Sequence, residues 1–358
     1  MVTMSQREIF IPISRLRSDP PAGSAPVLDT FGRPLRDLRI SVTDHCNFRC
    51  TYCMPRDRFG RDHAFLPHSQ ILRFEEVSRL AGLFHQLGVR KIRLTGGEPL
   101  LRRNLDRLVA MLAELPDIDL ALTTNGSLLA RHAASLRSAG LKRLTVSMDA
   151  LDDAIFQRMN DADYPASDVL NGIDAAQAAG FESIKVNMVV KRGVNDSQII
   201  PMARHFKGSG HILRMIEYMD VGSSNAWRMD EVVSAREMLA SLGEAFSLTP
   251  IGRHYPGEVA ERWQHTDGGG ELGIIAAVTR AFCHDCTRLR LSPEGKLFTC
   301  LFATQGHDIA GILRGGATDE QLTRRIARIW REREDRYSEL RGAGQGSTQK
   351  IEMSYIGG

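Results

Sequence analysis

The sequence of 358 residues predicts an α/β protein built as a partial (βα)6 barrel of the TIM type. Three observations lead to this prediction. Apolar, strand-like runs alternate with amphipathic, helix-like runs from residue 38 to residue 220. Gly88, Gly140 and Gly180 follow three of the helix-like runs at the position of a C-cap. Polar motifs follow the strand-like runs, at the edge where barrels place their active sites.

Six strands with helices between them are expected along the chain. The strands are residues 38–43, 91–95, 120–124, 143–148, 183–190 and 211–219. The helices are residues 74–87, 104–115, 128–139, 167–179 and 197–207. Strands that alternate with helices form a parallel sheet, because parallel neighbours need long crossover connections. No G-x-G-x-x-G turn follows the first strand, which favours a barrel over an open dinucleotide-binding sheet.

Three segments are expected. Residues 1–30 form a flexible N-terminal extension, and residues 31–220 form the barrel. Beyond the barrel the regular alternation stops, and helices are expected near residues 235–242 and 318–336. We expect this C-terminal region, residues 221–358, to close the side of the barrel where strands are missing.

The composition is that of an ordinary globular protein. The chain has 46 Lys and Arg against 43 Asp and Glu, a net charge of +3, and 42% hydrophobic residues. Nucleic-acid binding usually needs a strong basic excess, so we expect no nucleic-acid partner. No apolar run approaches the roughly 18 residues that span a bilayer, and the N-terminus has no signal-peptide pattern. We therefore expect a cytoplasmic protein without a membrane partner.

The six cysteines fall into two groups of three. The first group is Cys46, Cys50 and Cys53, a C-x3-C-x2-C loop that directly follows the first expected strand. Two tight groups in a chain without an export signal favour metal ligation over disulfides. Three thiolates can hold three irons of a [4Fe-4S] cluster and leave the fourth iron free for chemistry. A zinc site completed by His45 or His63 is the alternative.

The second cysteine group is Cys283, Cys286 and Cys300. It also has three thiols and no evident fourth ligand. A C-x2-C pair alone is also compatible with zinc, which His284 or His307 would complete. Beside a first incomplete group, a second [4Fe-4S] cluster whose free iron faces the same cavity is the better interpretation.

Several cations lie inside expected strands. Arg39, Arg93 and Lys185 are placed within the first, second and fifth strands, and Arg288 and Arg290 alternate on a further strand. Most Arg and Lys residues are ordinary surface charges, but a charge in a core strand is costly unless it meets a partner. Side chains two residues apart on a strand point the same way. The pattern therefore favours an anion such as a phosphate, which guanidinium groups bind through paired hydrogen bonds.

Two motifs carry a resemblance to a known family. The first cysteine loop has the aromatic Tyr52 before its last cysteine, and Gly96-Gly97-Glu98-Pro99 follows the second strand. Both resemble the signatures of radical S-adenosylmethionine (SAM) enzymes. Within that superfamily the chain resembles the GTP 3′,8-cyclases of molybdenum cofactor biosynthesis from residue 31 to its end. The usual Thr-Asp-Arg-Cys of that family reads Thr43-Asp44-His45-Cys46 here.

The resemblance implies a lyase that converts GTP to 3′,8-cyclo-7,8-dihydro-GTP with SAM and two [4Fe-4S] clusters. One electron cleaves SAM to a 5′-deoxyadenosyl radical, which takes hydrogen from C3′ of the ribose, and the carbon radical attacks C8 of guanine. The implied ligands of the two clusters are Cys46, Cys50 and Cys53 for the first and Cys283, Cys286 and Cys300 for the second.

The resemblance also implies contact residues. Those for SAM are Tyr52, Gly97, Ser147 and Met219. Those for GTP are Arg39, Arg93, Thr123, Lys185, Arg288, Leu289 and Arg290. Arg39 and the terminal Gly357 and Gly358 count among the catalytic positions, because the di-glycine tail of this family reaches into the active site.

The partners implied by the resemblance are GTP, an electron donor such as flavodoxin or ferredoxin, and a downstream cyclic pyranopterin monophosphate synthase. A monomer or a homodimer is expected. Two other functions fit parts of the sequence. One is a peptide-modifying radical SAM enzyme with an auxiliary cluster, although three downstream cysteines are few for that class. The other is a non-catalytic, zinc-stabilised nucleotide-binding protein.

Overall fold

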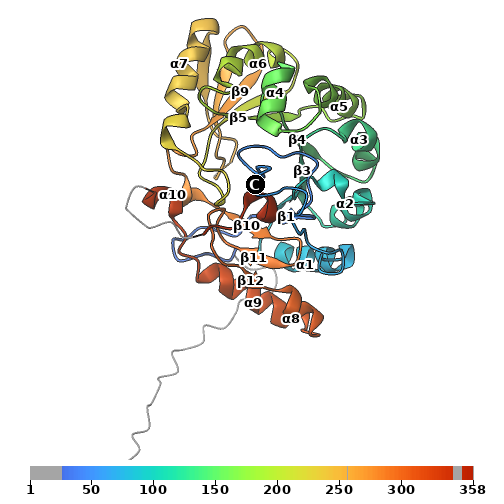
Figure 1. Ribbon diagram of the computed structural model, residues 1–358. Coiled ribbons are helices and arrows are strands. Elements are labelled where there is room, and N and C mark those ends of the chain that lie inside the picture. The colour runs from blue at the N-terminus through green and yellow to red at the C-terminus, as the bar shows by residue number, and fades with distance from the viewer. Residues whose placement is uncertain (1–25, 256, 342–348, 358) are drawn as a thin grey trace, which may run out of the picture.

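The computed structural model describes residues 26–255, 257–341 and 349–357, and it contains one mixed sheet of twelve strands (Figure 1). The strands, in chain order, are β1 (Asp37–Ser41), β2 (Lys91–Thr95), β3 (Asp119–Thr124), β4 (Arg143–Ser147), β5 (Lys185–Val190), β6 (Ile212–Glu217), β7 (Leu248–Ile251), β8 (Glu261–His265), β9 (Glu271–Ile275), β10 (Arg288–Leu291), β11 (Lys296–Phe298) and β12 (His307–Asp308). The spatial order is β12-β11-β10-β1-β2-β3-β4-β5-β6-β9-β8-β7. From β10 through β1–β6 to β9 all neighbours are parallel, whereas β11, β12, β8 and β7 join antiparallel.

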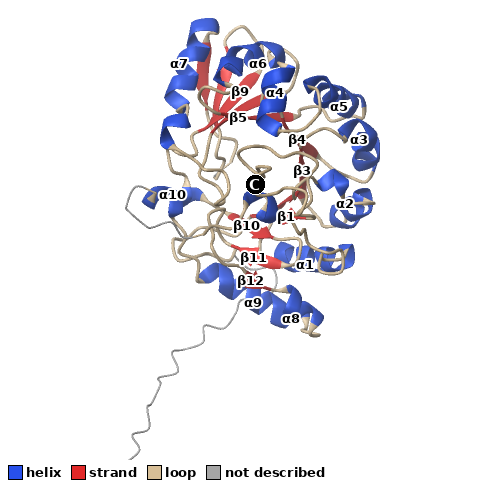
Figure 2. Cartoon of the chain, in the orientation of Figure 1, coloured by secondary structure: helices blue, strands red, loops and turns tan. Residues whose placement is uncertain are grey.

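Helices cover the outer face of the sheet, and Figure 2 shows them as a rim around the strands. Their bounds are α1 (Phe74–Gln86), α2 (Leu105–Ala113), α3 (Leu129–Ser138), α4 (Asp153–Asn160), α5 (Ala166–Ala178), α6 (Ile199–Phe206), α7 (Ala235–Ala245), α8 (Ala310–Arg314), α9 (Asp319–Arg331), α10 (Tyr337–Leu340) and α11 (Met353–Ile356). The red helix α11 lies inside the arc of strands (Figure 1). No helix in the described part of the chain is long and apolar enough to cross a membrane.

The alternation of side chains along the strands separates the core from the interior of the arc. In β1, Leu38 and Ile40 are fully buried in the hydrophobic core, while Arg39 between them points to the other face. β2 repeats this pattern with Ile92 and Leu94 around an arginine. Because the core face is fully apolar, polar residues of these strands gather on the inner face, where the site lies.

The six predicted strands and their parallel order are confirmed, and the five predicted helices occur within two residues of the expected bounds. Helix α4 was not predicted. It is only eight residues long and is capped by Asp152, whose side chain accepts a hydrogen bond from the amide of Ile155 at 2.9 Å. Of the C-terminal strands only β10 was expected. Strands β11 and β12 have three and two residues, and β7 and β8 are half exposed, so they lack the apolar alternation that marks a strand. Strand β9 is as long as β1 and mostly buried, and it was missed.

The predicted N-terminal extension, residues 1–30, falls mostly outside the described residues. Its last residues are packed against the fold. The buried Asp29 pairs with Arg33 at 2.5 Å and with Arg333 at 3.2 Å. Residues 26–30 therefore belong to the folded part of the chain, contrary to the expectation that they are flexible.

Candidate active site

A cavity of about 300 Å³ lies inside the arc of strands, and all six cysteines line it as free thiols. The two groups come from opposite ends of the chain. The first follows β1, and the second surrounds β10 and β11, of which β10 stands next to β1 in the sheet. The expectation that both groups face one cavity is confirmed.

Burial outweighs the nearby charges at the thiols of the first cysteine group, including that of Arg49, which lowers the pKa of Cys46. Burial, together with the nearby carboxylate of Glu98, raises the pKa of Cys46 to about 12. Burial also raises the pKa values of Cys50 and Cys53 above the usual range. The amide of Phe48 donates to the sulfur of Cys46 at 3.4 Å. These thiols are therefore neutral in the free chain, and a bound metal must supply the positive charge that makes them thiolates.

The Gly-Gly-Glu-Pro motif after β2 packs directly on the first cysteine loop. A Cβ on Gly97 would lie 2.2 Å from the carbonyl oxygen of His45, so only glycine fits. The amide of Gly97 donates to the carbonyl of Thr43 at 2.8 Å, and that of Glu98 donates to His45 at 2.7 Å. The motif is thereby fixed beside the cysteines, where the resemblance placed a SAM contact.

Glu98 also holds the loop that follows β3, through hydrogen bonds to its carboxylate. Its carboxylate accepts the amide of Asn125 at 2.7 Å, the hydroxyl of Thr124 at 2.8 Å and the amide of Leu100 at 3.0 Å. Burial raises its pKa to about 7, and these three hydrogen bonds favour the charged form. Hydrogen bonds to Glu98 thus connect the loops that follow β2 and β3.

Tyr52, the aromatic residue of the first cysteine loop, is held by Asp149 after β4. The Tyr52 hydroxyl donates to Asp149 Oδ2 at 2.8 Å, and the amide of Val189 donates to Oδ1 at 2.8 Å. Burial raises the pKa of Asp149 to about 6. Sequence reasoning did not identify Asp149 as a site residue, because its partner is 97 positions away.

The thiols of the second cysteine group lie among cations. Burial alone would raise the pKa of Cys286, but the charges of Arg288 and Arg333 outweigh it and lower that pKa to about 6. Arg288 Nε donates to the Cys286 sulfur at 3.5 Å. Burial and the nearby Asp335 raise the pKa of Cys300 to about 12. Arg333 and Asp335 were not predicted, since they lie in a charged run after α9 that looks like solvated surface.

Three arginines form a row across neighbouring strands. The register pairs Arg39 of β1 with Arg290 of β10 on one side and with Arg93 of β2 on the other. Burial and mutual repulsion lower the pKa of Arg39, and burial lowers those of Arg93 and Arg290 to about 10. Arg93 Nη1 donates to the hydroxyls of Thr123 at 2.8 Å and Thr145 at 3.0 Å. Such a row of crowded cations favours a polyanionic ligand.

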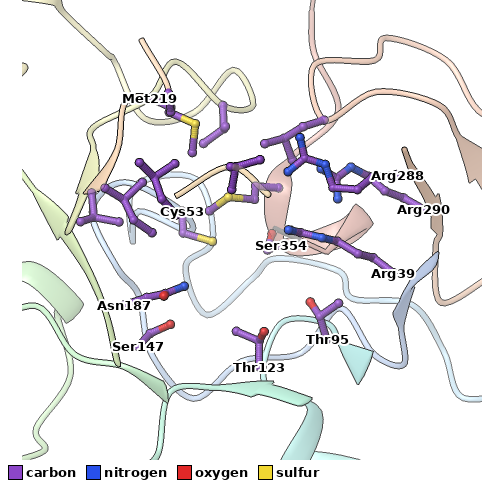
Figure 3. A pocket seen from close by; sticks show the side chains of 18 of the residues that line it. Arg39, Cys53, Thr95, Thr123, Ser147, Asn187, Met219, Arg288, Arg290 and Ser354 are labelled. Atoms are coloured by element: carbon purple, nitrogen blue, oxygen red, sulfur yellow. The ribbon is translucent and has the colours of Figure 1, made fainter. Parts of the chain in front are cut away.

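Figure 3 shows how these side chains face one another. Arg39, Arg288 and Arg290 enter the cavity from one side, and Ser147 and Asn187 point in from the opposite side. The predicted SAM contacts all line the cavity: Tyr52, Gly97, Ser147 and Met219. The predicted GTP contacts that line it are Arg39, Arg93, Thr123, Arg288 and Arg290.

Two predicted GTP contacts lie apart from this lining. The side chain of Leu289 is fully buried in the hydrophobic core. Lys185 stands on the inner face of β5, two residues before Asn187 of the cavity wall. Burial and the charges of Arg214 and further cations lower the pKa of Lys185 to about 7. Arg214 lines the cavity and was missed, although a charge inside a strand is the signal that identified Arg93.

The end of the chain enters the cavity. The carbonyl of Gly357 accepts a hydrogen bond from Arg290 Nη1 at 2.9 Å. Gly357 has φ +77°, and a Cβ there would lie 2.7 Å from Cγ2 of Thr95. Close approach to the strand therefore requires glycine at this position. Gly358, the other predicted tail residue, lies outside the described residues.

Comparison with known proteins identifies the family. Residues 40–206 match the model of the radical SAM superfamily, and residues 211–339 match the model named Molybdenum Cofactor Synthesis C. The chain is 55% identical to a GTP 3',8-cyclase of Acidothermus cellulolyticus, with 93% of this chain and 99% of the relative covered. It is 49% identical to that of Staphylococcus saprophyticus, with the same coverage. The chain belongs to the GTP 3',8-cyclase family. The recognition made from the motifs is thus confirmed.

A solved structure with a similar fold is Streptococcus suis SuiB bound to S-adenosylmethionine. The TM-score is 0.59 at 15% identity, with 87% of this chain and 68% of that chain covered. At this identity the likeness shows the fold alone, which is that of radical SAM enzymes.

The residues of this member of the GTP 3',8-cyclase family fit the iron-sulfur clusters that the family implies. Each cysteine group presents three thiols to the cavity and stands on a loop fixed to the sheet. The histidines considered as zinc ligands make other contacts: the ring of His45 stacks on Phe65 at 4.5 Å, and His284 pairs with Asp285 at 3.2 Å. Among the described residues, no three His, Cys, Asp or Glu side chains are grouped closely enough to hold a single metal ion.

Proposed function

We propose that this chain converts GTP to 3′,8-cyclo-7,8-dihydro-GTP in molybdenum cofactor biosynthesis, as a lyase that uses SAM. The observation that carries the proposal is the lining of one cavity by both cysteine groups and by the arginine row. Membership of the GTP 3',8-cyclase family supports the same reaction.

In this proposal strands β1–β6 and their helices form a partial (βα)6 barrel, and residues 221–358 close its open side. The parallel order of the strands supports the barrel, and the C-terminal strands that extend the sheet beyond β1 and β6 support the closure. The predicted division at residues 30 and 220 remains part of the proposal, except that residues 26–30 pack with the barrel.

Two [4Fe-4S] clusters are proposed, one held by Cys46, Cys50 and Cys53 and one held by Cys283, Cys286 and Cys300. When bound, the first cluster supplies the electron that cleaves SAM to a 5′-deoxyadenosyl radical. Tyr52, Gly97, Ser147 and Met219 would hold SAM beside the first cysteine group. Tyr52 is kept in place by its hydrogen bond to Asp149, so little freedom is lost when SAM binds.

The arginines would hold the GTP substrate, with its triphosphate on Arg39, Arg93, Arg288 and Arg290 and its ribose beside the first cysteine group. Each charge-assisted hydrogen bond contributes about 1.5–3 kcal/mol, so a few of them suffice for micromolar binding after association losses. Thr123, Lys185 and Leu289 complete the proposed set, Leu289 through its backbone because its side chain is buried in the core. Fixing the nucleotide keeps C3′ beside C8 and directs the reaction to one hydrogen. Gly357 would fix the orientation of Arg290 toward the substrate through its carbonyl.

The proposed partners follow from this chemistry. An electron donor such as flavodoxin or ferredoxin would reduce the first cluster, and a cyclic pyranopterin monophosphate synthase would consume the product. A monomer or a homodimer is proposed.

Anaerobic reconstitution with iron and sulfide, followed by incubation with GTP, SAM and a reductant, tests the function. We expect a product of the mass of GTP and, from GTP deuterated at C3′, deuterium in 5′-deoxyadenosine. Bound zinc without sulfide would instead indicate the nucleotide-binding alternative. SAM cleavage that never consumes GTP would indicate another radical enzyme, such as a peptide-modifying one.

A further inference from the structure

The C-terminal segment, residues 349–357, reaches the cavity although it belongs to no strand of the sheet. Its backbone joins the rest of the described chain where the amide of Ile351 donates to the carbonyl of Ala303 at 2.9 Å. Ordering such a segment costs conformational entropy at every residue, so its position needs anchors elsewhere.

One anchor is the buried carboxylate of Asp220, which follows β6. Its Oδ2 accepts the Tyr337 hydroxyl at 2.6 Å and Lys350 Nζ at 2.9 Å, and its Oδ1 accepts Arg341 Nε at 3.0 Å. Lys350 Nζ also donates to the carbonyl of Asp220 at 2.6 Å. Tyr337 and Arg341, which precede residues 342–348, and Lys350, which follows them, therefore bind the same carboxylate.

The charge of this anchor is maintained by its partners. Burial opposes ionisation of Asp220, but the hydrogen bonds from Tyr337 and Lys350 and the charge of Arg341 outweigh it and lower the pKa. Lys350 Nζ also lies 4.8 Å from the ring centre of Tyr337 and 5.5 Å from that of Phe302. Removal of Lys350 would thus withdraw one of several contacts and leave a charged carboxylate with its other donors.

A second anchor lies three and four residues after Asp220 in the same loop, at Ser223 and Ser224. Glu352 accepts the amide of Ser223 at 3.0 Å and the hydroxyl of Ser224 at 2.8 Å. The loop is tied to the SAM side of the cavity, because Asn225 Nδ2 donates to the carbonyl of Met219 at 3.1 Å. The loop that carries a proposed SAM contact therefore also holds the C-terminal segment.

We propose that Asp220 is a positioning residue that holds the C-terminal segment through Lys350, so that Gly357 reaches Arg290. This inference rests on the proposed function only where it assigns Arg290 to GTP. Asp220 touches neither substrate in this scheme. It acts by fixing where the end of the chain lies, and its position next to Met219 links the SAM side of the cavity to the GTP side.

Lys350→Met in the full chain tests the proposal, because methionine keeps the packing against the rings and removes the charge. Lys207→Met is the matched control: Lys207 likewise pairs with a carboxylate, Asp267, and lies 5.8 Å from the ring of Phe246. We expect hydrogen exchange at the amides of residues 351–356 to accelerate about tenfold in Lys350→Met, and to stay at the wild-type rate in Lys207→Met.

The same variants are then compared in the reconstituted enzyme. We expect Lys350→Met to raise KM for GTP several-fold with unchanged iron content and SAM affinity, and Lys350→Arg to restore both exchange rate and KM. Wild-type exchange in residues 351–356 of Lys350→Met would overturn the proposal. This result is independent of the proposed function, whose failure would appear as wild-type protein that makes no cyclised product.

Discussion

The two cysteine groups line the same cavity, but the charge around them differs. Glu98 and Asp149 lie near the first group, where burial raises the pKa values of all three thiols. Arg288 and Arg333 lie near the second group, and they lower the pKa of Cys286 to about 6. Carboxyl groups therefore lie beside the first half of the cavity, and cations lie beside the second half.

The difference shows how one cavity can serve two ligands of opposite charge. SAM carries a sulfonium cation, which is compatible with the acidic groups near the first cysteine loop. GTP is a polyanion, which suits the row of Arg39, Arg93 and Arg290. The two cysteine groups stand on separate loops, one after β1 and one around the neighbouring β10, so a side chain of either group can be altered without replacing one of the other.

Loss of a cysteine from either half gives the largest expected effect. It separates the proposed role of the first cysteine group in SAM cleavage from that of the second group in GTP conversion. Cys50→Ala should abolish both SAM cleavage and product formation, because the first cluster loses a ligand. Cys286→Ala should abolish product formation but keep reductive cleavage of SAM. The measurement is 5′-deoxyadenosine and cyclised product, quantified by mass spectrometry after reduction.

Iron content and circular dichroism of each cysteine variant provide the control for folding. If Cys286→Ala also lost SAM cleavage while its first cluster was still present, the division of the cavity into two roles would be wrong.

Removal of one cation from the arginine row should give the next largest effect. Arg39→Ala should raise KM for GTP about 10- to 100-fold, because a charge-assisted hydrogen bond contributes about 1.5–3 kcal/mol. Arg39→Lys should recover part of the loss, since lysine keeps the charge but not the paired geometry. Steady-state kinetics with saturating SAM measure both.

Arg79→Ala serves as the matched arginine control, because Arg79 lies on the outer surface in an ion pair with Asp319. Its KM should equal that of the wild type. If Arg39→Ala weakened SAM binding as much as it raised KM for GTP, the assignment of SAM and GTP to different halves of the cavity would be wrong.

Sequence reasoning predicted the parts whose signal is local. Runs of apolar residues, which the fold buries, predicted the six parallel strands. Arg39 and Arg93 were recognised because they are charged residues within such runs. Strands β7 and β8 have mixed exposure on both faces, so their residues carry no periodic pattern. Strand β7 pairs only with β8, and β8 joins the rest of the sheet through β9, which follows it in the sequence.

The residues missed at the site depend on contacts between distant parts of the chain. Asp149 becomes a site residue only through Tyr52, and Arg333 only through its contact with Cys286, whose carbonyl it binds at 2.7 Å. A charged run after a helix looks like surface until the fold brings it against a buried loop. The position of Lys185 outside the cavity lining likewise follows from its place at the start of β5.

Lys185 makes the cationic half sensitive to pH. Burial and neighbouring cations lower its pKa to about 7, so its ammonium is charged below that pH and neutral above it. If the triphosphate of GTP lies beside Lys185, as proposed, it stabilises the ammonium, and GTP binding above about pH 7 then takes up a proton. We expect GTP affinity to fall about tenfold between about pH 7 and about pH 8.5. Calorimetry in buffers of different ionisation enthalpy measures this uptake.

Lys185→Arg keeps its charge over this range, so its GTP affinity should decline much less. SAM affinity should not follow the titration of Lys185 in either protein, because SAM belongs to the other half of the cavity. A wild-type affinity for GTP that is constant from about pH 7 to about pH 8.5 would show that Lys185 does not contribute.

The smallest expected effect concerns the junction of the two halves, where Gly357 lies against Thr95. Gly357→Ala places a methyl group 2.7 Å from Thr95 Cγ2 and imposes φ +77° on alanine. A strained backbone of this kind costs at least about 1 kcal/mol, so turnover should fall at least about fivefold. Thr95→Ser removes the opposing methyl group but keeps the hydroxyl that accepts the amide of Gly96 at 2.6 Å. In the double variant turnover should recover in part, since the closest contact is removed while Thr95 Oγ1, 3.0 Å from the added Cβ, and the backbone strain remain. If Thr95→Ser gave no recovery, contact with β2 would not be what places the end of the chain.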